Sequence, residues 1–183
     1  MMISAPGYAM RTILWLAAAL LLSACVTQPL PDEHVDPACR DAHSPEFVVC
    51  QFYGRYLTLQ PEGLPGDVAL NILSPFITPD LESLLFATLD ARERYVADYP
   101  SRPVPLAEGA LFMRNLTPAQ QFTVLRRVAI DRDRVGVEVG LRGDSPPWRD
   151  LVILRLTQEG FLVDDIRFGG AGADEGTLRQ RLP

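Results

Sequence analysis

The stretch VGVEVGLR at residues 135–142 decides the fold class, because its apolar residues fall on every second position. Successive side chains of a β-strand point to opposite faces, so this alternation predicts a strand with one buried face. Outward from it, the nearly continuous apolar run at 151–157 predicts a central strand. A looser alternation at 122–130 and the segment 161–168 bring the expected antiparallel sheet to about four strands.

Two helix starts precede these strands. The tripeptides SPE at 44–46 and TPD at 78–80 each place a hydroxyl residue at the cap, a proline at the first helical position and an acid in the first turn. They predict helices from 45 to about 59 and from 79 to about 99, and the run at 68–73 suggests a short helix between them. Helices followed by strands predict an α+β domain whose N-terminal helices pack on a curved antiparallel sheet.

The N-terminal segment has the features of an export signal. Arg11 supplies a positive charge, and the apolar run at 13–22 is too short to span a bilayer comfortably. The stretch LSAC at 22–25 resembles a bacterial lipoprotein signal, in which the cysteine thiol receives a diacylglyceryl group and the preceding peptide is removed. The resemblance implies that 1–24 is a lipoprotein signal peptide and that Cys25 is acylated. An ordinary secretory signal followed by a chance cysteine is the alternative.

Acylation of Cys25 has consequences for the chain that follows. Two or three acyl chains hold a protein on a membrane far more firmly than one chain does, so membrane lipid is the first expected partner. Val26 stands where, in lipoproteins of this kind, an aspartate often means retention in the inner membrane. We therefore expect the protein in the bacterial cell envelope, lipid-anchored at the outer membrane and facing the periplasm. Residues 25–43, polar and rich in proline, form the expected lipidated tether, and residues 44–183 form the expected single domain.

Composition excludes several kinds of function. The chain of 183 residues has a formal net charge of −6, and nucleic acid requires a basic face, so no nucleic-acid partner is expected. The chain contains no lysine, which excludes a Walker-type phosphate loop and a Schiff-base catalyst. Both histidines, His34 and His43, precede the expected domain, and their spacing from the cysteines does not fit a zinc site. We therefore expect neither a metal nor a cofactor.

Two cysteines remain once Cys25 is acylated. Cys39 lies before the first predicted helix, and Cys50 lies within it. The thiols of an exported chain meet an oxidising compartment, where a pair of them tends to form a bridge. We therefore predict a disulfide between Cys39 and Cys50 that joins the tether to the domain.

Four charged residues are the candidates for a pocket or an ion pair. Asp164 and Asp165 are paired carboxylates of the kind that perform acid–base chemistry, but neighbours on a strand point to opposite faces. We expect one of them to cap or pair at the sheet edge while the other is solvated. Arg92 interrupts an apolar helix face and Arg155 an apolar strand, and a buried arginine needs a carboxylate partner. Two explanations stay open, an ion pair with Asp164 or Asp165 and an anion site inside the domain.

Several short blocks of the chain resemble one family. They are QFY at 51–53, LSPFI at 73–77, WRD at 148–150, EGFLVDDIRF at 159–168 and GTLRQ at 176–180. In these blocks the chain is similar to the small bacterial envelope lipoproteins that carry domain of unknown function 3828. The resemblance implies a nuclear transport factor 2-like fold, in which helices and a bent sheet form a cone that holds a ligand or a catalytic dyad. It transfers no catalytic residue.

Two functions of different class follow as expectations. The first is a non-catalytic binding or scaffold module, not an enzyme, for another envelope protein or a small ligand. Its expected contacts are the exposed face of the helix 79–99 and the C-terminal tail with Arg179 and Arg181. The alternative is an isomerase or hydratase with a site inside the cone, for which Arg92, Arg155 and one of Asp164 or Asp165 form the candidate polar set. The first is favoured because no histidine lies within the expected domain to support a nucleophile.

Overall fold

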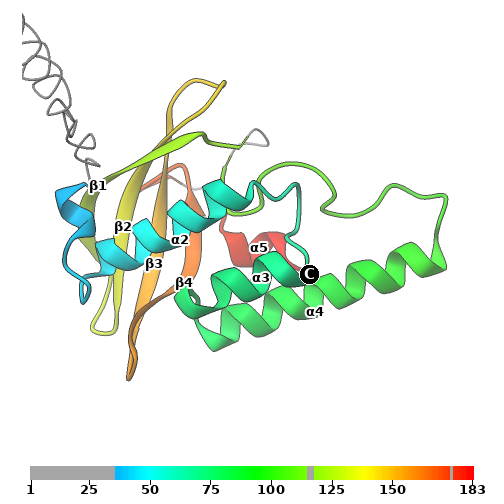
Figure 1. The fold of residues 1–183 in the computed structure, drawn as a ribbon, viewed down its shortest axis with the longest axis horizontal. Coiled ribbons are helices and arrows are strands. Elements are labelled where there is room, and N and C mark those ends of the chain that lie inside the picture. Colours follow the sequence, from blue (N-terminus) through cyan, green and yellow to red (C-terminus); the bar gives the residue numbers. More distant parts are fainter. Residues whose placement is uncertain (1–35, 115–117, 174) are drawn as a thin grey trace, which may run out of the picture. The chain divides into compact units, whose positions relative to one another are not determined.

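The computed structural model describes residues 36–114, 118–173 and 175–183. Its α+β architecture confirms the expected fold class (Figure 1). The expected signal peptide 1–24 and the acylation site Cys25 lie outside the described residues. Among the helices that are described, none combines the length and the apolar character needed to cross a bilayer. The elements in chain order are η1 (Pro37–Cys39), α2 (Pro45–Leu59), α3 (Asp67–Leu73), η2 (Ser74–Phe76), α4 (Pro79–Asp98), β1 (Gln121–Ala129), β2 (Arg134–Arg142), β3 (Trp148–Thr157), β4 (Gly160–Phe168) and α5 (Leu178–Arg181).

Side-chain caps fix where the two main helices begin. Ser44 Oγ accepts a hydrogen bond from Phe47 N at 3.1 Å, and Thr78 Oγ1 accepts one from Leu81 N at 3.3 Å. Each cap satisfies a backbone N–H group that has no acceptor inside the helix, an effect of about 1 kcal/mol. A proline follows each cap at the first helical position. The helices α2 and α4 therefore start where the sequence predicted.

The four strands form an antiparallel sheet in the order β1-β2-β3-β4. β2 shows the predicted alternation, because Val137 and Val139 are fully buried in the core while Gly136 and Gly140 fall on the other face. The sheet is open and curled, and α2 lies against it in contact with β1, β2 and β4 (Figure 1). β-Bulges at Leu125 in β1 and in β4 interrupt the pairing and locally increase the twist.

Aromatic side chains fill the space between α2 and the sheet. Phe52, Tyr53 and Tyr56 of α2 are almost completely buried, as is Phe112 in the segment before β1. Phe112 lies edge-on to Phe52 and to Tyr56, with ring centroids 5.2 and 5.1 Å apart. Tyr53 packs against Phe122 of β1 at 5.7 Å. Aromatic pairs of this kind contribute roughly 0.5–1.5 kcal/mol each beyond the area that they bury. Packed rings therefore hold α2 in place against the sheet.

The two edges of the sheet differ. Along β4, Thr78 N donates a hydrogen bond to Val163 O at 2.8 Å, and Phe168 N donates one to Gly176 O at 3.1 Å. Segments from before and after the sheet in sequence therefore cover the β4 edge. Within residues 36–114, 118–173 and 175–183, no strand pairs with the outer edge of β1.

Candidate functional site

Asp164 accepts hydrogen bonds from three side chains that belong to three different elements. Thr78 Oγ1 donates to Oδ1 at 3.0 Å, Arg155 Nη2 donates to Oδ2 at 3.1 Å, and Arg179 Nη2 donates to Oδ1 at 3.0 Å. Asp164 is only 4% exposed, so these donors replace the water that a free carboxylate would bind. Arg155 also donates to Asp80 at 3.0 Å, in the first turn of α4. The cluster thus ties α4, β3, β4 and α5 together.

Asp165 accepts its hydrogen bonds from backbone groups. Ile166 N donates to its Oδ1 at 2.8 Å, and Arg179 N donates to the same oxygen at 3.1 Å. Asp164 is the extra residue of the bulge in β4, which breaks the strict alternation of side chains. The bulge lets both carboxylates reach donors of the domain, with Asp164 buried and Asp165 half-buried.

Arg92 lies apart from this cluster. Its Nη1 donates to Leu64 O at 3.0 Å, in the connection between α2 and α3. Within the described parts of the chain, no carboxylate lies at ion-pair distance from Arg92. The guanidinium satisfies a backbone carbonyl in a buried connection instead of the carboxylate that the sequence analysis expected. Arg92 and Arg155 therefore do not converge on one site.

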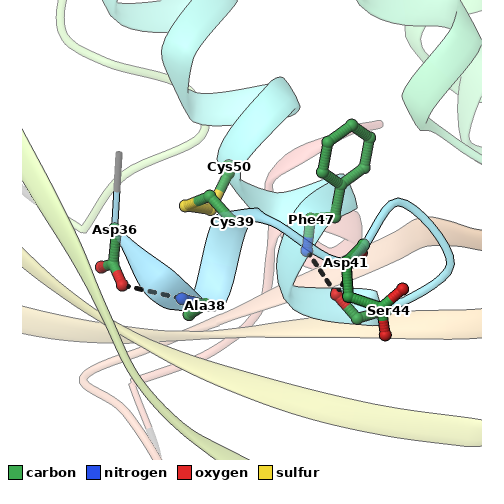
Figure 2. The surroundings of a disulfide bond; sticks show 7 residues. All are labelled: Asp36, Ala38, Cys39, Asp41, Ser44, Phe47 and Cys50. Carbon is green, nitrogen blue, oxygen red and sulfur yellow. Dashed lines mark hydrogen bonds between the residues drawn. A yellow bond between two sulfur atoms is a disulfide. The ribbon is translucent and has the colours of Figure 1, made fainter. Parts of the chain in front are cut away.

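Cys39 and Cys50 are joined by a disulfide, with their Cα atoms 5.8 Å apart. Figure 2 shows the bond between η1 and α2, close to the hydrogen bonds that shape η1 and the start of the helix. Residues 36–43, which the sequence assigned to the tether, are thus fastened to α2. The disulfide fixes the point at which the chain enters the domain.

A buried acid that the sequence analysis did not single out lies on β3. Asp150 is fully buried, and Gly169 N donates to its Oδ1 at 3.1 Å. Its Oδ2 accepts from Arg114 N at 3.1 Å and from Trp148 Nε1 at 3.3 Å. Burial raises the pKa of Asp150, and these hydrogen bonds offset part of the rise. Its place directly before the apolar run at 151–157 was the signal in the sequence.

Arg181 of α5 lies near Asp150 and is partly buried. Its guanidinium carbon lies 3.5 Å from the centroid of the Phe168 ring, and its Nη1 donates to Met113 O at 2.7 Å. Desolvation lowers the pKa of Arg181, while the nearby Asp150 carboxyl counteracts this effect. Arg181 also lines a small hollow of about 130 Å³. Arg179 and Arg181, which the sequence analysis expected as contacts for a partner, are therefore engaged within the domain.

Two phenols are buried beside these groups. Tyr53 OH donates to Phe112 O at 3.3 Å, whereas Tyr56 OH is a buried group without a partner among the residues described. Burial raises the pKa of both phenols, so both are neutral at physiological pH. Three donors, two backbone N–H groups and the Trp148 indole, occupy the carboxylate of Asp150 beside these phenols. In the described parts of the chain, no three His, Cys, Asp or Glu side chains form a potential metal site.

The helix α4 changes character halfway along its length. Leu81, Leu85 and Leu89 are buried in the core, whereas no residue from Asp90 to Asp98 is buried. In Figure 1 this second half of α4 extends past α3 and the sheet. The part of the predicted contact surface at 79–99 that is free of core packing is therefore its C-terminal half.

The α4 tip, defined as Tyr95, Val96 and Tyr99 at the end of α4 together with Arg102 and Val104 of the loop that follows, presents apolar and aromatic groups to solvent. Val96 is 39% exposed, Tyr99 45% and Val104 41%. The rings of Tyr95 and Tyr99 lie 5.2 Å apart, and Arg102 stacks on Tyr99 at 4.6 Å. Tyrosine and arginine are enriched at protein interfaces and at their energetic centres. The α4 tip can therefore bind an apolar surface of another molecule.

A scan against models of protein families and searches of curated proteins and of solved structures find no match to this chain. The likeness to proteins with domain of unknown function 3828 and the cone of the nuclear transport factor 2-like fold therefore stay predictions. The described residues thus contain two kinds of candidate feature. One is the set of polar clusters that join the elements of the domain, and the other is the exposed aromatic surface at the α4 tip.

Proposed function

We propose that this protein is a lipid-anchored lipoprotein of the bacterial outer membrane that faces the periplasm and acts by binding another envelope protein. The observation that carries the proposal is the α4 tip, where two tyrosines, two valines and a stacked arginine lie outside the core. Stacking restrains these side chains before any partner binds, which reduces the entropy lost on association. We further propose that the domain belongs to the envelope lipoproteins that carry domain of unknown function 3828, with their cone-like fold.

The disulfide and the sequence before it support the location. A Cys39–Cys50 bond suits an oxidising compartment such as the periplasm. The LSAC stretch at 22–25 supplies the site for acylation. Even fully extended, the eleven residue steps from Cys25 to Asp36 span at most about 40 Å. An anchor at Cys25 would therefore confine the domain to the membrane surface and raise its effective concentration for neighbours there.

The positions of the charged residues support contact over turnover. An isomerase or hydratase needs polar groups that converge on an accessible cavity. Arg155 and Asp164 instead bind each other, and Arg92 binds a backbone carbonyl. These groups stabilise the domain that presents the α4 tip.

The contact is tested by photo-cross-linking in intact cells, because a chain without lysine gives little reaction with amine-directed reagents. A photoreactive p-benzoylphenylalanine replaces Val96 at the α4 tip. The matched control replaces Val68 of α3, which is 76% exposed but lies outside the α4 tip. We expect an adduct of defined mass from position 96 that weakens with Tyr99→Ser, and none of that mass from position 68. Equal adducts from both positions, unaffected by Tyr99→Ser, would contradict the proposal.

A further inference from the structure

A hollow of about 460 Å³ opens on the face of the sheet opposite α2. Its size falls within the range of known ligand sites. The hollow lies where β1 begins, β2 ends and β3 begins. Its walls come from short stretches of three strands, with Gln121, Thr123 and Leu125 from β1, Gly140 and Arg142 from β2, and Arg149 from β3, and from Pro147 before β3.

Strand pairing explains why this face is hollow. Gly140 pairs with Thr123 on one side and with Arg149 on the other, so a row across three strands has no side chain at its centre. A Cβ atom at Gly140 would lie 3.4 Å from the side chain of Leu125, at the border of the hollow. The floor at Gly140 is therefore backbone, and the walls provide a hydroxyl, an amide and two guanidinium groups beside apolar side chains such as Leu125 and Pro147.

The two arginines of the hollow are available to bind an anion. Within the described residues, the Arg142 side chain forms no hydrogen bond or ion pair. Arg149 is 64% exposed and lies 4.0 Å from Glu138 Oε2, an oxygen that Arg126 already binds at 2.7 Å. In a chain of net charge −6, this patch is locally basic. Guanidinium groups bind carboxylates through paired, charge-assisted hydrogen bonds.

The hollow adjoins the open edge of the sheet. β1 pairs regularly with β2 from Gln121 to Val124, before the bulge, and its outer edge is unpaired within the described residues. An extended peptide can add to such an edge through main-chain hydrogen bonds. Alternate side chains of an added strand lie about 7 Å apart on one face, as do Gln121 and Thr123. Acidic side chains at two such positions would lie beside Gln121 and Thr123 and extend across β1 toward Arg142 of β2, with Arg149 one strand further. The length of a glutamate and of an arginine side chain together bridges this gap.

We infer that the β1 edge and this hollow bind an extended acidic segment of a partner protein. The inference goes beyond the proposed function, because it involves neither the α4 tip nor the anchor. A strand edge favours a polypeptide over an anionic lipid, since only a polypeptide supplies the backbone groups that pair with β1. The arginines then select acidic side chains, and the glycine floor gives those side chains room.

The test measures fluorescence anisotropy of a labelled peptide of alternating threonine and glutamate, titrated with the full chain in detergent. We expect saturable binding that weakens roughly tenfold in Arg142→Gln and in Arg149→Gln, the loss for one charge-assisted hydrogen bond. Gly140→Val fills the hollow without changing charge and should weaken binding as much. Thr123→Glu, a surface change on β1, tests the same site if Gly140→Val folds poorly. Arg94→Gln, on the exposed side of α4, is the matched charge control and should bind like the wild type.

Three results would overturn the inference. One is equal affinity for a peptide of alternating threonine and glutamine. Another is binding that is the same in all variants. The third is arginine-dependent binding to phosphatidylglycerol vesicles with none to the acidic peptide, which would assign the site to lipid. Cross-linking from position 96 should be the same in these variants, so failure here is distinguishable from failure of the proposed function. Hydrogen exchange that slows at 121–124 on peptide binding would place the segment on the β1 edge.

Discussion

Removal of the Cys39–Cys50 disulfide should destabilise the whole domain, and the size of the effect follows from the structure. The two cysteines are separated by 11 residues. In the loop-closure model, a bridge of this span lowers the entropy of the unfolded chain by an amount worth roughly 3 kcal/mol at 25 °C. One kcal/mol shifts the Tm of a unit of this size by about 2–4 °C, so reduction should lower the Tm by about 6–12 °C.

Differential scanning calorimetry with and without a reductant measures this shift, and mass spectrometry of alkylated thiols verifies that the bond is open. The double variant Cys39→Ser/Cys50→Ser is the control and should melt near the reduced wild type, with or without reductant. Hydrogen exchange at residues 36–43 should rise as well, because the disulfide fastens this segment to α2. A Tm that changes by less than about 2 °C after complete reduction would show that the disulfide contributes little to the stability of the domain.

Further predictions concern the polar clusters and the core. Asp164→Asn should lower the free energy of unfolding by about 2–4 kcal/mol in urea denaturation, because it leaves two guanidinium groups without their shared carboxylate. Asp80→Asn, whose side chain is 67% exposed, should change it by no more than about 0.5 kcal/mol. Tyr53→Phe should lose about 1 kcal/mol with the bond to Phe112 O, whereas Tyr56→Phe should be neutral or stabilising because no bond is lost. The hydrogen bond from Arg126 lowers the pKa of Glu138, so Glu138 contributes stability above its unfolded pKa of about 4.3 that is lost as pH falls through the lower folded pKa. Glu138→Gln should therefore show a flatter loss of stability between about pH 5 and pH 3 than the wild type.

The parts of the fold that could be predicted depend on local chemistry. The caps at Ser44 and Thr78 act on the next three residues, and they mark α2 and α4 correctly. The alternation in β2 predicts one buried face of the strand, and that face lies against the core in the structure. These features need no knowledge of distant residues, so the sequence is sufficient for them.

The segment between α4 and β1 could not be predicted in the same way. Its residues Leu111, Phe112 and Met113 are buried although they belong to no helix or strand. No periodic pattern marks such a segment, because each of its side chains fills a gap left by other elements. Gly63, at φ 67°, allows the same region to pack closely, since a Cβ atom there would lie 2.1 Å from Leu106 O. This close contact is between residues about 40 positions apart in sequence, Gly63 and Leu106, so no local pattern reveals it.

The candidate site differed from the expectation for a similar reason. The bulge at Asp164 depends on how β4 pairs with β3, and it brings both carboxylates to donors that a regular strand would not allow. Arg92 binds the carbonyl of Leu64, a partner that composition and spacing do not reveal. The α4 tip was included in the predicted contact surface, but only the structure separates its exposed half from its buried half.

In the proposed function an acyl group on Cys25 holds the domain at the membrane, and the mass of the protein from the membrane fraction is the decisive measurement. Intact-protein mass spectrometry, combined with labelled fatty acid, should find a chain that begins at Cys25 and carries the label. Cys25→Ala should remove the label and leave the precursor uncleaved, because cleavage follows lipid addition. An unlabelled wild-type chain, or a Cys25→Ala variant that is processed and labelled as usual, would contradict the anchor and with it the proposal that this protein acts from the membrane surface.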